Sequence, residues 1–239
     1  MRFIGIDLAW TTKNETGICV LDGAGNILHL SAEVYSNDEL INIIQEFYLH
    51  PTIVAIDAPI VVPNETGSRP AESALARDLV HNHRIRAFHC SRSYLTKHYG
   101  GIRAEEIAQR LTDNMNFKIG YFQGEDCIVE TLPTGIIAGL FPEHAPFKYK
   151  IKKGVNTQLA CEELERLVSL FTENRLKNYF EMNASLKYSK KFHKHREDQI
   201  DAFLCAYMGY RLLYKGTKVL IYGDYKNGFI LLPLEEREK

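Results

Sequence analysis

The sequence predicts a mixed α/β fold, and two observations support this prediction. Two short apolar runs each end in an aspartate, Phe3 to Asp7 and Ile53 to Asp57, and both have the continuous apolar character of buried strands. Segments with apolar residues at helical spacing lie between and after them. The chain has 239 residues, of which 45% are hydrophobic, so it can bury a full core, most simply as one domain with insertions.

The first quarter of the chain is expected to form four strands and one helix. The expected strands cover residues 2–9, 17–21, 27–35 and 52–57, and a hairpin turn signal runs from Asp22 to Gly25. Ser36 is a favourable N-cap for the helix, and Pro51 closes it. The apolar residues of this helix recur at helical spacing: Leu40, Ile43, Ile44, Phe47 and Tyr48.

Beyond Asp57 the pattern is less regular. Residues from about 60 to 125 are expected to form an insertion on the carboxyl side of the sheet, with helices at about 70–83 and 103–115. The later expected elements are a fifth strand at 126–131, a helix at 133–140, an irregular insertion at about 141–156, helices at 157–172 and 196–214, and a terminal hairpin built from 217–222 and 229–232.

Acidic residues at the strand ends and on the late helix form the candidate site. Asp7 and Asp57 end apolar strands, and Asp198 and Asp201 are three residues apart, which puts them on one helix face. Carboxylates at the ends of buried strands cost desolvation energy, which a divalent cation usually compensates. A purely structural interpretation is also open, with Asp7 as a loop cap, Asp57 as a turn residue and Asp198 as an acid favoured by the helix dipole.

The order of the elements and the motifs resembles the ribonuclease H-like superfamily, especially its Holliday-junction-resolvase-like branch. More narrowly, the chain resembles the family known as domain of unknown function 429, whose members are generally described as predicted nucleases. The resemblance implies a mixed five-stranded sheet in the order 3-2-1-4-5, with strand 2 antiparallel, helices on its flanks and an insertion after strand 4. The motifs span most of the chain: Gly5-Ile6-Asp7, Ile56-Asp57-Ala58-Pro59, Glu130-Thr131-Leu132-Pro133, Tyr149-Lys150 to Gly154, and Asp198-Gln199-Ile200-Asp201-Ala202.

The resemblance also implies a nuclease in which carboxylates hold two magnesium or manganese ions that flank a scissile phosphate. By position, Asp7, Asp57 and Asp201 correspond to the metal-binding trio, and Asp198 to a fourth ligand or an outer acid. Glu130 ends the fifth strand, where it either approaches the same metals or forms a salt bridge with a nearby lysine. These five acids are the candidate catalytic residues.

Basic residues interleaved with aromatic ones are candidates for contacts with a nucleic-acid backbone. One stretch runs from Lys187 to Arg196 into the late helix, and another from Lys148 to Gly154; each could instead be a solvated linker. The irregular insertion adds arginines, which suit bidentate phosphate contacts better than lysines do. The candidate substrate-binding residues are Arg77, Arg86, Lys150, Lys152, Lys153, Lys190 and Lys191.

Two other function classes are weighed against the nuclease. Sugar kinases and actin-like ATPases share the fold, but Ala58 and Pro59 stand where a phosphate loop needs glycine and backbone donors. A catalytically silent module that binds a small phosphorylated ligand, nucleic acid or protein stays open, and the net charge of −1 favours it mildly. Five scattered cysteines and the lack of a long apolar run favour a cytoplasmic protein with reduced thiols and without a membrane anchor.

Overall fold

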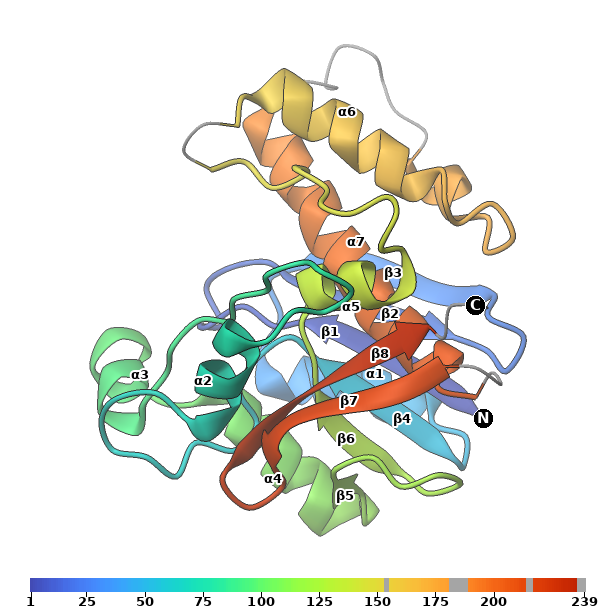
Figure 1. The fold of residues 1–239 in the computed structure, drawn as a ribbon. Coiled ribbons are helices and arrows are strands. Elements are labelled where there is room, and N and C mark those ends of the chain that lie inside the picture. Colours follow the sequence, from blue (N-terminus) through green and yellow to red (C-terminus); the bar gives the residue numbers. More distant parts are fainter. Residues whose placement is uncertain (153–154, 181–188, 214–216, 236–239) are drawn as a thin grey trace.

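A six-stranded, mostly parallel sheet forms the centre of the molecule, with the strand order β3-β2-β1-β4-β6-β5 (Figure 1). The computed structural model describes residues 1–152, 155–180, 189–213 and 217–235. The neighbouring strands β1, β4, β6 and β5 are parallel, and β2 runs antiparallel to both β1 and β3. The strands are β1 (Arg2–Asp7), β2 (Thr16–Leu21), β3 (Ile27–Glu33), β4 (Thr52–Ile56), β5 (Lys118–Ile119) and β6 (Cys127–Glu130).

The five strands expected from the sequence are present, and β2 is antiparallel as expected. The strand order differs in one detail, because the two-residue strand β5 extends the sheet beyond β6. Residues Lys118 and Ile119 lie in the region interpreted as an insertion. A strand of two residues is too short to show an apolar run or an alternating pattern in the sequence. Its pairing with β6 is visible only in the folded structure.

Seven α-helices and one short 3₁₀ helix, Leu176–Phe180, occur in the described residues. Three expectations were wrong in detail. The second helix ends at Arg77 rather than near residue 83, because Asp78 takes an extended conformation and the chain then turns at His81 and Asn82 with positive φ. The third helix was missed, and the last helix begins at Lys190, so part of the basic stretch interpreted as a linker is helical. The helices are α1 (Asn37–Phe47), α2 (Pro70–Arg77), α3 (Arg92–Tyr99), α4 (Arg103–Met115), α5 (Pro133–Leu140), α6 (Thr157–Val168) and α7 (Lys190–Arg211).

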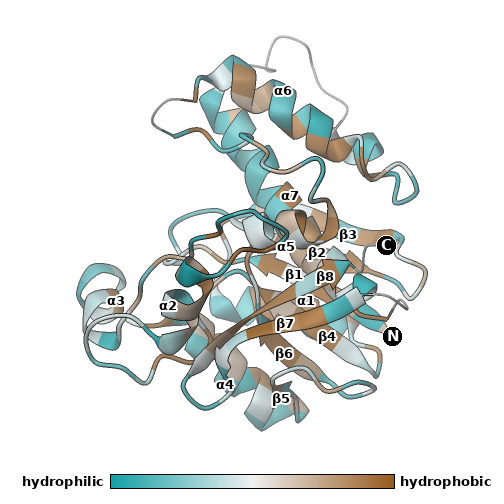
Figure 2. Ribbon diagram, viewed as in Figure 1, coloured by the Kyte–Doolittle hydropathy of each residue, from teal (hydrophilic) through white to brown (hydrophobic). Residues whose placement is uncertain are grey.

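The chain ends in the expected antiparallel hairpin, formed by β7 (Thr217–Asp224) and β8 (Gly228–Glu235). The hairpin is separate from the main sheet, and β8 packs against α5 and β6 (Figure 1). Leu231 and Leu232 of β8 are fully buried. In Figure 2 the strands of the sheet and the hairpin carry most of the hydrophobic residues, whereas α3 is largely polar.

Helix α7 lies across one face of the sheet and approaches β1 and β2 unusually closely. A Cβ atom added at Gly5 would lie 2.1 Å from the carbonyl oxygen of Ala202, and one added at Gly17 would lie 2.0 Å from the carbonyl oxygen of Asp198. Side chains alternate between the two faces of a strand, so Ile4 and Ile6 point away from α7 into the core on the other face. Glycine is therefore required on both strands where the helix crosses them.

Within the described residues, no helix combines the length and the apolar character that a membrane span needs.

We expect Gly5→Ala to destabilise the protein by at least about 3 kcal/mol, the upper end of overpacking costs, because the new methyl group meets helix backbone that cannot move aside. Urea unfolding monitored by circular dichroism measures the change. Gly23→Ala is the matched control: a Cβ there meets nothing within 4 Å, and stability should be unchanged or slightly raised. Equal stability of the two variants would contradict the close approach of α7.

Candidate metal centre

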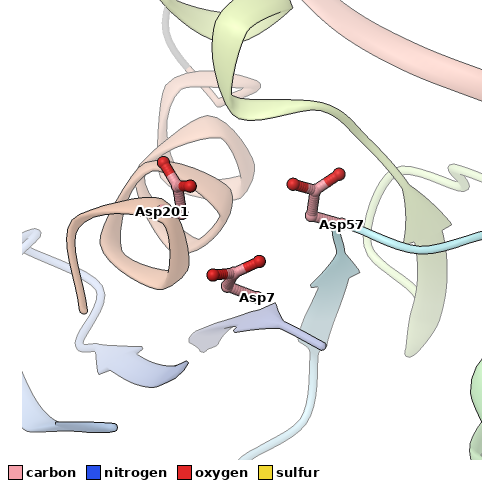
Figure 3. A group of neighbouring side chains, drawn as sticks. All are labelled: Asp7, Asp57 and Asp201. Atoms are coloured by element: carbon pink, nitrogen blue, oxygen red, sulfur yellow. The ribbon is translucent and has the colours of Figure 1, made fainter. Parts of the chain in front are cut away.

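Three aspartates from three elements converge at one edge of the sheet. Asp7 ends β1, Asp57 directly follows β4, and Asp201 lies in α7 (Figure 3). One carboxylate oxygen from each residue lies within 4.8 Å of the other two. Because β1 and β4 are adjacent and parallel, their carboxyl ends meet, and the close crossing of α7 brings the third acid to them. The convergence expected from the sequence is thus present in the structure, while ligation of a metal by these residues stays a prediction.

Asp201 is fully buried and is held by two neighbouring residues of the loop between α5 and α6. The Tyr149 hydroxyl donates a hydrogen bond of 2.6 Å to one carboxylate oxygen, and the Lys150 ammonium lies 2.5 Å from the other. Lys150 was a candidate for substrate contact, but its ammonium pairs with a carboxylate of the cluster. Tyr149 belongs to a motif noted in the sequence, although nothing local in the sequence connects it with Asp201.

The electrostatics of the cluster show crowded negative charge. Burial raises the pKa of Asp7 well above its usual range, and the nearby Asp201 and Asp57 add to the rise. Burial likewise raises the pKa of Asp57 to about 7; Lys150 opposes this rise and Asp201 adds to it. Burial alone would lower the pKa of Lys150, but the carboxylate of Asp201 raises it well above its ordinary value. The acids therefore favour any cation that enters between them.

Asp198 stands beside the trio rather than within it. Its carboxylate shares a hydrogen bond with Asp7 and lies 2.5 Å from the Lys194 ammonium. Lys194 also contacts Glu197 at 3.0 Å, so this one ammonium bridges two acids of the first turns of α7. Asp198 is not one of the three acids whose oxygens lie within 4.8 Å of one another, and its role as a fourth ligand or an outer acid stays a prediction. Lys194 is a charge partner that the sequence did not reveal.

Glu130 lies at the end of β6 but outside the group of three acids. Its carboxylate is buried and forms two hydrogen bonds with the Arg69 guanidinium, one of them 2.8 Å long, and a third with the backbone N–H of Ile60. Of the two interpretations considered, the salt bridge is the one the structure contains, with an arginine in place of a lysine. Burial lowers the pKa of Arg69, but its hydrogen bonds to Glu130 outweigh this effect and raise it above its ordinary value.

The donor set of the trio fits a divalent cation. Three carboxylates and the one ammonium of Lys150 leave two uncompensated negative charges when all the acids are ionised. Carboxylate oxygens are the ligands that Mg²⁺ and Mn²⁺ prefer, and Asp7 and Asp57 are partly open to solvent while Asp201 is buried. The residues that would hold the ion are Asp7, Asp57 and Asp201.

The candidate substrate-binding cations lie at different places around this cluster. Lys191 lines a cavity of about 450 Å³ together with Asp7 and Asp198. Arg86 and Lys152 line a second cavity of about 440 Å³, which Tyr149 borders. Its lining contains no acidic residue from the part of the chain that the structure describes. Lys190 is exposed on the first turn of α7.

The two remaining candidates are Arg77 and Lys153. Arg77 is exposed at the end of α2 and lines neither of these two cavities. Lys153 lies outside the described residues.

Two aromatic residues that the sequence did not single out also border the cluster. Trp10 and Phe88 line a cavity of about 230 Å³ together with Asp7 and Asp57. Trp10 comes three residues after Asp7, the last residue of β1, so its closeness in sequence could have indicated that it borders the cluster. Phe88 lies in the irregular insertion, where no periodicity points to its place.

The sequence was compared with protein families, curated proteins and solved structures. A sequence model of the family described as "Protein of unknown function (DUF429)" matches residues 5–226. No curated protein and no solved structure matches the chain. The match includes every acid of the cluster.

We expect Asp57→Asn to stabilise the metal-free protein at alkaline pH. The folded-state pKa of about 7 exceeds the usual aspartate value of about 3.9, so the folded protein keeps a proton that the unfolded chain loses between these values, and the wild type loses stability as the pH rises. The gain of the variant should be on the order of 4 kcal/mol at about pH 8 and small below about pH 4. Urea unfolding in EDTA measures it.

The same variant should lose its heat of Mg²⁺ or Mn²⁺ binding in calorimetry. A stability difference that does not change with pH would contradict the crowding of charge around Asp57, and intact metal affinity would remove Asp57 from the ligand set.

Proposed function

Because the chain belongs to the DUF429 family, whose function is unknown, we propose its function from the site itself: a divalent-metal-dependent nuclease that hydrolyses phosphodiester bonds in nucleic acid. The observation that supports this proposal most directly is the convergence of Asp7, Asp57 and Asp201 at the carboxyl ends of two central strands. Such a set of carboxylate oxygens with two uncompensated charges suits metal-assisted hydrolysis of a phosphate ester.

The topology supports a place in the ribonuclease H-like superfamily as part of the same proposal. Strands β3, β2, β1, β4 and β6 lie in the order inferred for that fold, with β2 antiparallel. The late helix crosses the sheet and places an aspartate opposite the ends of β1 and β4. In this proposal β5 and the terminal hairpin are additions to the shared core.

The residues divide the work of hydrolysis as follows. Asp7, Asp57 and Asp201 supply oxygen ligands, and Tyr149 and Lys150 fix the orientation of the Asp201 carboxylate. One or two bound Mg²⁺ or Mn²⁺ ions would lower the pKa of the attacking water and neutralise charge on the phosphate and the leaving oxygen.

Asp198 has a supporting position in this scheme. Its carboxylate is paired with Lys194 and hydrogen-bonded to Asp7, and this contact keeps the Asp7 carboxylate turned toward the cluster.

The two cavities beside the cluster offer paths for the phosphates of a polynucleotide. Lys191 lines one of them next to Asp7, and Lys190 precedes it on the exposed start of α7. Arg86 and Lys152 line the other, on the side of Tyr149. The whole molecule has almost no net charge, so attraction of a polyanion must come from local cations such as these.

A catalytically silent binding module is the second candidate, and the position of Lys150 favours it. Its ammonium already pairs with Asp201 and thereby does part of the work of a metal ion. In a silent module this pairing would be sufficient, and the cleft would bind a phosphorylated ligand without cleaving it. The two candidates differ in whether divalent metal raises the melting temperature, since an ion that binds only the folded state stabilises it.

We expect the purified protein to cleave single- or double-stranded nucleic acid or a branched junction in the presence of Mg²⁺ or Mn²⁺. Asp7→Asn should lose at least about 10²–10³-fold of this activity, the loss typical of removing one group that stabilises charge in the transition state. Gel assays with end-labelled substrates measure the rate. Asp113→Asn, which changes an aspartate on the exposed side of α4, is the matched control and should cleave at the wild-type rate.

Absence of cleavage by the wild type on all three substrate types with Mn²⁺, together with an unchanged melting temperature on metal addition, would leave the silent module as the better account.

We expect Lys190→Gln combined with Lys191→Gln to weaken binding of an oligonucleotide and to flatten its dependence on salt. Each lost phosphate contact should reduce the slope of log K against log salt by roughly 0.7–0.9. Fluorescence anisotropy in EDTA measures both quantities without cleavage. The matched control is Lys118→Gln with Lys226→Gln, two exposed lysines on β5 and in the hairpin turn. An equal loss in both double variants would indicate a general charge effect rather than a path along α7.

A further inference from the structure

A cluster of aromatic side chains stands beside the carboxylates. Trp10 stacks on Tyr99 with ring centroids 5.2 Å apart and an interplanar angle of 15°. The ring centroid of Phe88 lies 5.4 Å from that of Trp10, with an interplanar angle of 55°. Tyr94 contacts both Phe88 and Tyr99. Despite these contacts, 50% of Phe88 and 39% of Tyr94 are exposed. Exposed aromatic rings that are fixed by neighbours, rather than scattered singly, indicate a binding surface.

Trp10 separates two cavities that both reach Asp7. On one side the cavity of about 230 Å³ contains Asp57 and Phe88, and its remaining wall is largely apolar. On the other side the cavity of about 450 Å³ contains Lys191 and Asp198. The apolar residues of the smaller cavity are Leu8, Ala58, Pro59, Ala87, Leu132 and Ile230. The smaller cavity also contains the ion pair of Arg69 and Glu130, and the larger one also contains Lys194 and Glu15. An aromatic and apolar surface and a set of mixed charges that includes Lys191 therefore meet at Asp7.

The ring of Trp10 is held firmly enough to serve as a platform. Its inner edge packs on a small buried cluster formed by Val62, Cys90 and Leu95, and Tyr99 covers part of its surface. Trp10 is itself only partly buried. A rigid aromatic ring loses little conformational entropy when a second flat ring stacks on it.

We propose that the aromatic wall formed by Trp10 and Phe88 stacks an unpaired nucleobase of the substrate, and that the protein therefore selects single-stranded nucleic acid. This inference rests on the proposed nuclease function and specifies its substrate class. A base on this wall places its own phosphate toward Asp7 and Asp57, while the next phosphates follow Lys191 in the other cavity. A base in a duplex is already stacked and paired, and it would first have to be extruded at a cost of a few kcal/mol.

Alternative occupants fit less well. A protein side chain could fill the smaller cavity, but it would bring no charge for Lys191 on the other side of Trp10. A free phosphate would suit the lysine and leave the aromatic wall unused. A nucleotide within a strand has both a flat π surface and an anion at a fixed separation, which is the combination that the two cavities share.

The test uses the fact that Trp10 is the only tryptophan of the chain. Its fluorescence therefore reports on this wall alone. The protein is titrated in EDTA with oligothymidylate and oligouridylate of about ten nucleotides, with an abasic oligomer of equal length and charge, and with the corresponding duplex. The proposal expects quenching by the single strands with saturable affinity, and little quenching by the abasic oligomer or the duplex.

Variants locate the effect on the wall. Phe88→Ala should weaken single-strand binding by about 5- to 100-fold, as measured by anisotropy, because one stacked base contributes about 1–3 kcal/mol. Trp10→Ala should do the same, and Trp10→Phe should retain most of the affinity. Phe122→Ala is the matched control: its ring is 38% exposed in the loop before β6, at the opposite end of the strands, and affinity should not change. If Trp10→Ala fails to fold, Trp10→Phe and Phe88→Ala still decide the question.

The outcome separates this inference from the nuclease itself. Quenching and variant effects without any cleavage would support base stacking on the aromatic wall and contradict the proposed nuclease activity. Equally fast cleavage of duplex and single strand, with equal binding of the abasic oligomer, would contradict base stacking on the wall. The proposed nuclease activity would remain supported. Failure of wild-type protein to bind any of these oligomers would also overturn the inference.

Discussion

The close crossing of α7 over β1 and β2 is the constraint on which the site depends. Two glycines, Gly5 and Gly17, let the helix backbone lie where a methyl group would otherwise stand. The atoms that such methyl groups would meet belong to Ala202 and Asp198, one residue after and three residues before Asp201. A helix packed at the ordinary distance would carry Asp201 several ångströms away from Asp7. The geometry of the acidic cluster is therefore set by the absence of two side chains outside it.

The crowding that results has an energetic cost, which the protein offsets only in part. Burial and neighbouring acids raise the pKa of both Asp7 and Asp57, so part of the cluster prefers to be protonated in the absence of a further cation. Lys150 and Lys194 compensate Asp201 and Asp198 from opposite sides. Functional sites typically retain such unfavourable electrostatics, because the same crowding provides affinity for a ligand of opposite charge.

Much of the framework could be predicted from the sequence, since local patterns encode it. Continuous apolar runs identified β1 and β4, and the three-residue spacing of Asp198 and Asp201 placed both on one helix face. The start of α7 was missed because residues from Lys190 to Arg196 are mostly polar and lack an apolar stripe.

The partners of the acids could not be predicted in the same way. Lys150 reaches Asp201 across 51 positions of sequence, and Arg69 reaches Glu130 across 61. Contacts that join a residue outside the regular elements to a distant helix or strand leave no periodicity to detect.

The pairing of Arg69 with Glu130 has a consequence for how such a protein can change over evolution. The arginine belongs to the segment inserted after β4, whereas the glutamate ends a strand of the central sheet, and both are almost completely buried. Deletion of the segment would leave an unpaired carboxylate in the core, at a cost of about 3–5 kcal/mol. The inserted segment is thus not a detachable module, and it can be lost or exchanged only together with a substitution on the strand.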